Sequence, residues 1–188
     1  MAELFIELFS EEIPAKLQID ARTRIKGAIE EKLKKNTINY KLSKSFSTPK
    51  RLVFFINGIP EKIEQKKKIL KGPKIGSPQS AIDGFIRSNN LKESEVYKEK
   101  NKKGEFYFAK TQSKIINILE ELQSIIPDVL QNYSWKKSMR WADYDLSWGR
   151  PLKSIAALFN NKLIKFNFFH LESDNSTFVD DLSDKKKK

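Results

Sequence analysis

The spacing of apolar residues predicts a strand followed by a long helix at the start of the chain. Leu4 to Leu8 is a short apolar run interrupted only by Glu7, which is typical of a buried strand. Six apolar residues then recur at helical spacing: Leu17, Ala21, Ile25, Ala28, Ile29 and Leu33. We therefore predict a helix from about Ala15 to Lys35, with Pro14 in its first turn and Glu11 and Glu12 near the positive end of its dipole.

The pattern then changes to one that predicts strands. Lys44 to Ile59 is rich in β-branched and aromatic residues and predicts a strand, in which Pro49 is expected at an edge or a bulge. Glu61 to Leu70 predicts a further strand with Ile63 and Ile69 facing inward, ended by Gly72-Pro73.

The second half of the chain alternates between helical and hairpin patterns. Pro78 is placed to open a short helix that ends near Asn89-Asn90, and Val96 to Thr111 predicts a hairpin that turns at Asn101 to Gly104. Ile115 to Tyr133 has helical spacing, and Pro127 is expected to break or kink it, so that two helices can form there. Ser154 to Phe168 predicts a second hairpin, with its turn at Asn160-Asn161-Lys162.

Composition restricts the classes of protein and of chemistry. The chain has 188 residues, which suits one large domain or two small ones, and 39% hydrophobic residues are enough for a core. With no Cys and one His, the sequence excludes a disulfide framework, a Cys-based zinc site and a pair of His ligands. The sequence contains no run of uncharged residues that approaches the length of about 18 needed for a membrane span. The acidic start does not resemble a signal peptide, so none is predicted.

The net charge of +12 favours a polyanionic partner, nucleic acid first. Lysine supplies 30 of the 36 basic residues, however, and a lysine-rich composition is also what an AT-rich genome produces. Clustering is more informative than the total. From Lys50 to Lys74 there are eight basic and two acidic residues, so this segment carries +6, half of the net charge.

Nine basic residues are therefore candidates for contact with RNA: Lys50, Arg51, Lys66, Lys67, Lys68, Lys71, Lys74, Arg140 and Arg150. Each has a structural alternative. Lys50 and Arg51 can flank an edge strand, and Lys66 to Lys68 can form a solvated face. Arg140 lies among tryptophans that can stack on bases or pack in the core, and either Arg140 or Arg150 can pair with Asp143 or Asp145.

The sequence contains no motif for autonomous catalysis. It has no phosphate-binding loop of the G-x-x-x-x-G-K-[ST] type and no G-x-S-x-G nucleophile turn. His170 has no identifiable partner for a triad or a metal site and is interpreted as structural. We predict no catalytic residue, no metal ligand and no bound cofactor in this chain.

Several short strings resemble, in their order, the start of the bacterial two-subunit glycyl-tRNA synthetase beta subunit family. They are Glu11-Glu12-Ile13-Pro14, Thr48-Pro49-Lys50-Arg51-Leu52, Lys71-Gly72-Pro73, Lys137-Ser138-Met139-Arg140-Trp141 and Arg150-Pro151-Leu152. The resemblance covers about residues 3 to 177, which is only the beginning of a subunit several times longer. Beyond Thr177 the sequence departs from the family and runs into a lysine tail, so we expect an amino-terminal portion or a truncated gene product.

The resemblance implies an α+β fold of mixed or antiparallel sheets with packed helices, similar to domains of the phenylalanyl-tRNA synthetase beta chain. Residues 1–179 are expected to form the amino-terminal region, as one unit or two α+β subdomains, and residues 180–188 a disordered charged tail. The implied function is support of ATP-dependent attachment of glycine to tRNA(Gly) in the cytoplasm, with the alpha subunit and tRNA(Gly) as partners and no membrane. ATP is used by the whole enzyme and held by the alpha subunit. The alternatives are a stand-alone RNA-binding module and a non-functional remnant.

Overall fold

A computed structural model gives the structure of the chain at residues 2–65, 69–89, 91–101, 104–110, 114–179 and 186–187. The chain forms two compact units, and each is described by itself. Unit 1 consists of Met1–Ile63 and Asn117–Lys188, and unit 2 is the segment Glu64–Ile116. Both combine helices with largely antiparallel sheets, so the predicted α+β class is confirmed.

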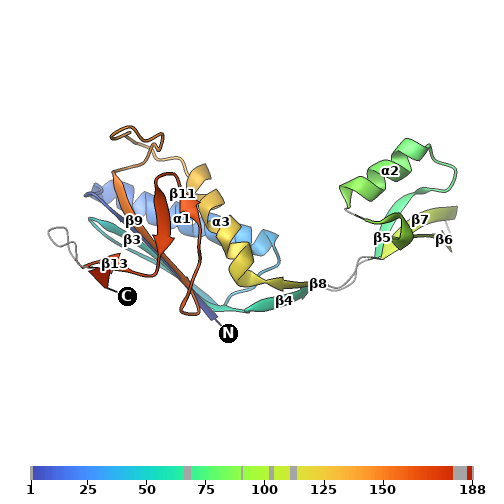
Figure 1. Cartoon of the computed structure of the whole chain (residues 1–188), viewed down its shortest axis with the longest axis horizontal. Coiled ribbons are helices and arrows are strands. Elements are labelled where there is room, and N and C mark those ends of the chain that lie inside the picture. The colour runs from blue at the N-terminus through green and yellow to red at the C-terminus, as the bar shows by residue number, and fades with distance from the viewer. Residues whose placement is uncertain are drawn as a thin grey trace. The chain divides into compact units, whose positions relative to one another are not determined.

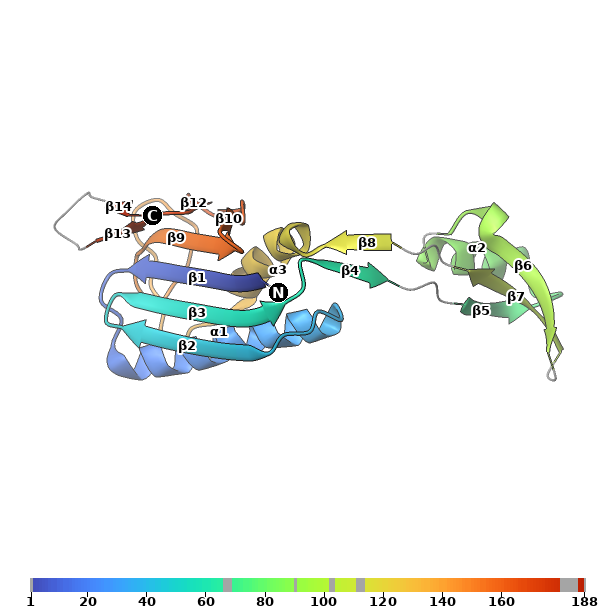
Figure 2. The same cartoon turned by 90° about the horizontal axis from the view of Figure 1, so that it is seen from below.

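Unit 1 is built on a seven-stranded sheet (Figure 2). Its central strand β1 (Ala2–Ser10) pairs antiparallel with both β3 (Arg51–Ile59) and β9 (Leu152–Phe159). The order of the path is β11-β12-β9-β1-β3-β2, and β10 also pairs with β9. The remaining strands are β2 (Leu42–Thr48), β10 (Lys162–Leu163), β11 (Asn167–Phe168) and β12 (Leu171–Asp174), the last of which runs parallel to β9.

Helices α1 (Ala15–Lys35) and α3 (Ile118–Asn132) pack on one face of this sheet (Figures 1 and 2). Helix α1 occurs where its pattern predicts, and its buried side chains are Ala21, Ile25, Ile29 and Leu33. Pro14 is its N-cap, and Glu11 and Glu12 precede its first turn, which contains no acidic residue, so their role at the positive end of the dipole stays a prediction. Glu11 accepts from Lys153 of β9 at 2.6 Å, and this hydrogen bond lowers the pKa of the Glu11 carboxyl.

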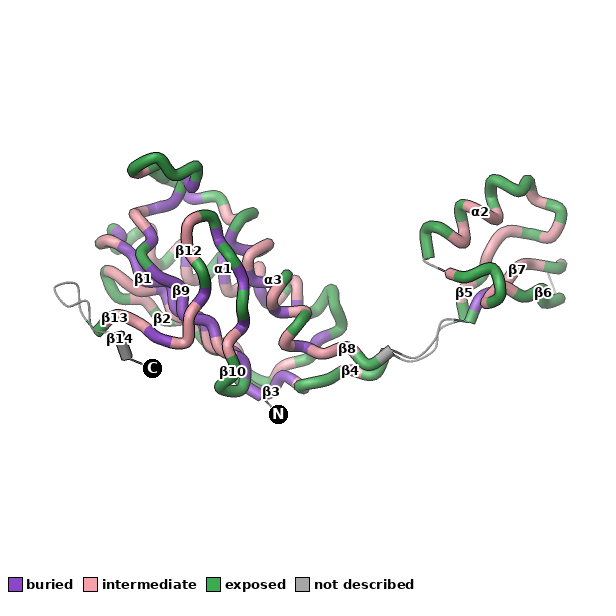
Figure 3. The backbone as a smooth tube through the Cα atoms, in the orientation of Figure 1, coloured by how far each residue is buried: buried purple, intermediate pink, exposed green. Residues whose placement is uncertain are grey.

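The core of unit 1 lies between the sheet and these helices. Alternate residues of β1 are almost fully buried, and Leu4, Ile6 and Leu8 lie opposite equally buried residues of β3. Figure 3 shows the buried residues concentrated in the central strands and the two helices. Part of the other face is covered by β13 (Thr177–Phe178), which pairs with β14 (Lys186–Lys187) and places Phe178 5.5 Å from Phe9, measured between ring centroids.

One helix, α3, replaces the two predicted between Ile115 and Tyr133. Pro127 lies inside it, although an interior proline costs about 3 kcal/mol. Its neighbours Ile125, Ile126 and Val129 are all buried, and each buried aliphatic side chain contributes about 1.5–3 kcal/mol. Burial on both sides of the proline therefore outweighs the lost hydrogen bond. The helix is also capped by Asn117, whose side-chain oxygen accepts from the Leu119 amide at 3.2 Å.

The two hairpin regions of unit 1 differ in detail from their predictions. Thr48 pairs with Arg51 in register, so Pro49 and Lys50 form the two-residue turn of a β2–β3 hairpin and Pro49 is not an edge or bulge residue of one strand. The predicted turn at Asn160-Asn161 is confirmed, with φ of 49° and 61°. The returning chain pairs with β9 at Lys162 and Leu163, and the Ile164 amide donates to the Ala157 carbonyl at 3.0 Å, whereas β11 pairs with β12.

The predicted strand from Glu61 to Leu70 is wrong, because the boundary between the units falls within it. Strand β4 (Lys62–Gln65) pairs with β8 (Lys114–Asn117), whereas β5 (Ile69–Lys74) belongs to the sheet of unit 2. Gly72-Pro73 lies inside β5 rather than after it, and Ile69 is 63% exposed instead of facing inward.

Unit 2 is a three-stranded antiparallel sheet in the order β5-β7-β6, with one helix packed on it. The predicted hairpin is confirmed as β6 (Val96–Asn101) and β7 (Gly104–Lys110), and the predicted short helix as α2 (Gln79–Ser88). A 3-10 turn, Glu93–Glu95, precedes β6. Among the described residues of unit 2, Ala109 alone is a buried hydrophobic residue, and Figure 3 shows this unit as mostly exposed or intermediate, so it has a thin core. Its aromatic residues Tyr97, Phe106, Tyr107 and Phe108 are partly exposed.

Candidate nucleic-acid interface

The structure divides the predicted basic segment from Lys50 to Lys74 between the two units. Lys50 and Arg51 belong to unit 1, whereas Lys71 and Lys74 belong to unit 2. Lys66, Lys67 and Lys68 lie outside the described residues. The segment is therefore continuous in sequence, but its described members do not share one sheet.

Arg51 is held within unit 1 by a cluster that the sequence did not reveal. Its Nη1 donates to Glu7 Oε1 at 2.7 Å and to Thr177 Oγ1 at 2.8 Å, and its Nη2 donates to the Phe178 carbonyl at 2.5 Å. The Thr177 hydroxyl also donates to the Glu7 carboxylate. With side-chain exposures of only 20% for Arg51 and 9% for Glu7, this ion pair is largely buried. The guanidinium also lies 4.4 Å from the ring centroid of Phe9.

The turn at Lys50 is also tied to the body of unit 1. The Ser10 amide donates to the Lys50 carbonyl at 2.9 Å, and the Ile13 amide donates to the Pro49 carbonyl at 2.7 Å. These bonds, with the Arg51 cluster, give the Thr48-Pro49-Lys50-Arg51 string a structural function. Contact of Lys50 or Arg51 with RNA stays a prediction.

Unit 2 carries more than half of the net positive charge of the chain. Its 53 residues include thirteen Lys and Arg against six Asp and Glu, a net charge of +7 out of +12 for the whole chain. Such a density favours contact with phosphates, because bound counterions are released when lysines neutralise them.

One face of the unit 2 sheet is covered by α2, and the other is not (Figures 1 and 2). A Cβ at Gly72 would lie 2.9 Å from the Phe85 ring of α2, so the helix lies directly on this glycine. Since side chains alternate along a strand, Lys71 must point to the opposite side. We call this side the open face and define it by the residues that the pairing register places there: Ile69, Lys71, Lys74, Tyr97, Glu99, Phe106, Phe108 and Lys110.

Lys71 is positioned on the open face by an aromatic ring. Its Nζ lies 3.7 Å from the centroid of Phe106, in cation–π geometry. Lys74 is in register with the same Phe106, and Lys110 follows two residues after Phe108 on the same strand. Of the predicted site residues, the structure thus brings Lys71 and Lys74 together, and it adds Lys110.

The tryptophans near Arg140 divide into core and surface. Trp148 is 1% exposed and packs edge-on against Trp135 at 5.2 Å and Phe168 at 5.6 Å, so the alternative of core packing is confirmed for this ring. Tyr133 joins the cluster at 5.2 Å from Trp135, and burial, with Asp20 nearby, raises the pKa of Tyr133 to about 12.

The two arginines of this region have different surroundings. Arg140 is exposed, and Arg150 Nη1 donates to the Gly149 carbonyl at 2.8 Å. Among the described residues, neither forms an ion pair with Asp143 or Asp145, so the predicted alternative of such pairs is wrong. Contact of either arginine with RNA stays a prediction.

His170 packs against surface aromatic residues. Its ring stacks on Tyr144 with centroids 3.8 Å apart and lies edge-on to Trp141 at 5.9 Å. Within the described residues, no group of three or more His, Asp or Glu side chains could hold a metal ion. In the same part of the chain, no helix has the length and apolar character needed to cross a membrane.

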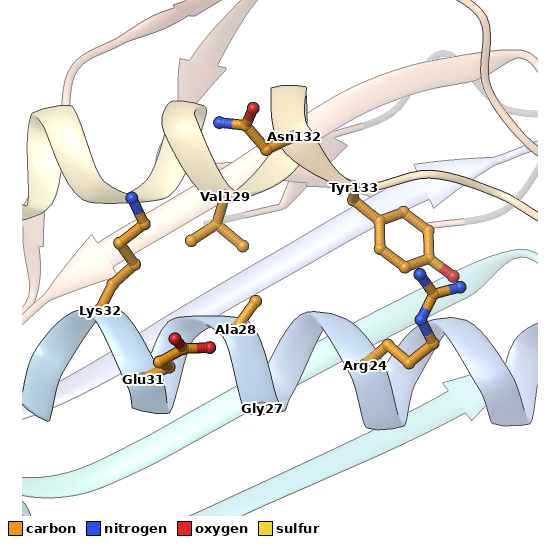
Figure 4. Close-up of a pocket in the computed structure, with 8 residues that line it drawn as sticks. All are labelled: Arg24, Gly27, Ala28, Glu31, Lys32, Val129, Asn132 and Tyr133. Atoms are coloured by element: carbon orange, nitrogen blue, oxygen red, sulfur yellow. The ribbon is translucent and has the colours of Figure 1, made fainter.

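A groove of about 560 Å³ lies between α1 and α3 of unit 1 (Figure 4). Arg24 and Tyr133 lie at one end and Glu31 and Lys32 at the other, with Ala28 and Val129 between them. Lys32 is neutralised by Asp128 at 2.5 Å. This mixture of charges does not favour a polyanion, so the groove is not a candidate nucleic-acid interface.

Gly27 lines this groove, and we expect Gly27→Ala to raise the free energy of unfolding of unit 1 by about 0.5–1 kcal/mol. An added Cβ would meet nothing within 4 Å, so the gain in helix propensity is not offset by a clash. Gly149→Ala is the matched control, because its Cβ would lie 2.4 Å from Trp135 Cε3 and should destabilise the unit. Urea denaturation followed by tryptophan fluorescence measures both; equal effects of the two variants would contradict this account.

Comparison with known proteins identifies related sequences over the full chain. The family model of the glycyl-tRNA synthetase beta subunit matches residues 4–187. The glycine–tRNA ligase beta subunit of Rickettsia bellii (strain OSU 85-389) is 35% identical over 189 residues, which is 100% of this chain and 28% of the relative. The corresponding proteins of Rickettsia peacockii and Rickettsia canadensis are 35% and 34% identical over 187 residues, with the same coverage. The chain thus spans about 28% of the length of these relatives.

Proposed function

Because the chain belongs to the glycyl-tRNA synthetase beta subunit family, we propose that it supports ATP-dependent attachment of glycine to tRNA(Gly) by binding the tRNA through unit 2. The relatives are beta subunits of glycine–tRNA ligase, so the reaction itself belongs to an assembly of which this chain corresponds to about 28% of one subunit. In this proposal, ATP and glycine are bound by the alpha subunit, and no residue of this chain acts as nucleophile or base.

The observation that carries the proposal is the concentration of charge in unit 2. A net +7 within 53 residues, with Lys71 and Lys74 on a sheet face that α2 leaves uncovered, is suited to a phosphate backbone. Unit 1 offers less, because Arg51 is used internally and the groove between its helices is electrically mixed.

Charge reversal on the open face is expected to weaken tRNA binding. We expect Lys71→Glu with Lys110→Glu to lower the affinity of the chain for tRNA(Gly) by about 10- to 100-fold near 0.1 M salt. The dependence of log K on log salt should also become shallower, by about 0.7 to 0.9 for each lost phosphate contact. Binding of labelled tRNA(Gly) at several salt concentrations measures both quantities.

The matched control reverses two exposed lysines of unit 1. Lys16→Glu lies in the first turn of α1, where a negative charge is favourable, and Lys165→Glu removes only a surface pair with Glu172. The variant with both substitutions changes the net charge by the same amount as Lys71→Glu with Lys110→Glu, so an equal loss of affinity would contradict a role for unit 2.

Co-purification of this chain with the alpha subunit tests whether the alpha subunit is a partner. Failure to bind either tRNA(Gly) or the alpha subunit would contradict the proposed function for this chain.

A further inference from the structure

The open face of unit 2 holds two aromatic rings side by side. Tyr97 of β6 is directly opposite Phe108 of β7 in the antiparallel register, and their ring centroids are 6.2 Å apart with an interplanar angle of 27°. Tyr97 is 38% exposed and Phe108 is partly exposed. The pair therefore presents flat apolar surface to solvent instead of filling the core.

Basic groups border these rings on the same face. Lys71 is in register with Phe108 while its ammonium group lies over Phe106, and Lys110 is two residues from Phe108. One acid, Glu99, is in register with Phe106. The rings are thus bounded by three lysines and one glutamate, which favours an anionic ligand that also has a flat apolar surface.

This combination distinguishes unpaired nucleotides from other partners. Each unpaired base offers a π face that stacks on an aromatic ring, and each nucleotide brings a phosphate. In a duplex, the bases are already stacked and their faces are inaccessible, so only the lysines could contribute. An apolar protein surface would match the rings but would leave the ammonium groups of Lys71 and Lys74 without partners.

We propose that the open face of unit 2 binds a single-stranded segment of RNA by stacking bases on Tyr97 and Phe108, with phosphates at Lys71, Lys74 and Lys110. The proposal rests on the proposed function, in which unit 2 binds tRNA, and adds that unpaired nucleotides are what it recognises. Phe106 has a different role in this proposal, because its ring positions the Lys71 ammonium group beside the rings of Tyr97 and Phe108.

The test compares ring removal with ring retention at one position. Tyr97→Leu removes the ring, whereas Tyr97→Phe keeps it and loses only the hydroxyl. The 188-residue chain and both variants are titrated into a labelled ten-nucleotide U-rich RNA and into a labelled RNA duplex of equal length. We expect Tyr97→Leu to bind the single strand about tenfold more weakly, with an unchanged salt slope, and Tyr97→Phe to bind it within twofold of the original chain.

Controls separate stacking from folding and from charge. Phe46→Leu removes a 53% exposed ring from β2 of unit 1 and should leave affinity unchanged. Lys71→Ala should weaken binding and reduce the salt slope, which ring removal should not do. Circular dichroism of Tyr97→Leu shows whether unit 2 remains folded, and Tyr97→Phe provides a second, conservative comparison.

The outcomes distinguish this proposal from the proposed function. Equal affinity of Tyr97→Leu and the original chain for the single strand, or equal binding of strand and duplex, would overturn stacking while lysine-dependent tRNA binding could still hold. Weak binding by Tyr97→Phe as well as Tyr97→Leu would also overturn it, because the ring would then not be the required group. No binding of tRNA or of either RNA would overturn both proposals together.

Discussion

Replacing Arg51 by alanine is expected to lower the free energy of unfolding of unit 1 by about 3 kcal/mol. The substitution leaves the Glu7 carboxylate, only 9% exposed, without its cation, and removal of one partner of a buried ion pair costs about 3–5 kcal/mol. It also removes the donors to Thr177 and Phe178, which hold β13 on the sheet. All three tryptophans lie in unit 1, so urea denaturation followed by tryptophan fluorescence reports on this unit.

A double-mutant cycle separates the ion pair from the loss of packing. Glu7→Ala combined with Arg51→Ala should cost clearly less than the sum of the two single variants, because the double variant leaves no buried charge unpaired. Additive costs, or a change below about 0.5 kcal/mol for Arg51→Ala alone, would contradict the account of a buried pair. Binding of tRNA(Gly) by the Arg51→Ala chain, measured where it remains folded, tests the RNA contact predicted for Arg51.

Trp148→Ala is expected to destabilise unit 1 by about 3–5 kcal/mol, the usual range for removing a large aromatic side chain from a core. Trp148 is 1% exposed and has Trp135, Tyr133 and Phe168 within 6.1 Å, measured between ring centroids. Alanine would leave a cavity among three rings, of which Phe168 lies in β11 and Tyr133 and Trp135 directly follow α3. The midpoint of urea unfolding and the near-UV circular dichroism of the remaining tryptophans measure the loss.

Trp141→Ala provides the comparison on the same loop. Trp141 is partly exposed and contacts Tyr144 and His170 at the surface, so its removal should cost far less, about 1 kcal/mol. If Trp141→Ala proved as destabilising as Trp148→Ala, the division of these tryptophans into core and surface would be wrong.

Elements with a strong local pattern could be predicted from the sequence. The spacing of Ala21, Ile25, Ile29 and Leu33 predicted α1, and the turn-prone sequence between Asn101 and Gly104 predicted the hairpin pairing of β6 with β7. Pro127 was misleading because its local cost is fixed, whereas the compensating burial depends on a sheet that forms from distant segments. The division at residues 62–74 was missed for a similar reason: an alternating pattern does not reveal which sheet each half joins.

The candidate site was predictable only in part. The density of lysine in unit 2 is visible in the sequence, but the open face depends on the packing of Phe85 against Gly72, which relates positions on different elements. Arg51 matched an RNA-binding residue in charge and shape, yet its partner Glu7 is 44 positions away and Thr177 is 126 away. The similarity to phenylalanyl-tRNA synthetase beta domains stays a prediction.

The central place of β1 has a consequence for synthesis on the ribosome. Its two partners are far apart in the chain, since β3 ends at Ile59 and β9 begins at Leu152, and all of unit 2 is made between them. Unit 2 can therefore complete its contacts first, while one edge of β1 still presents unpaired amides and carbonyls with Leu4, Ile6 and Leu8 beside them. A nascent polypeptide whose synthesis stalls before Leu152 would expose this unpaired strand edge, and we expect it to be the species most prone to aggregate.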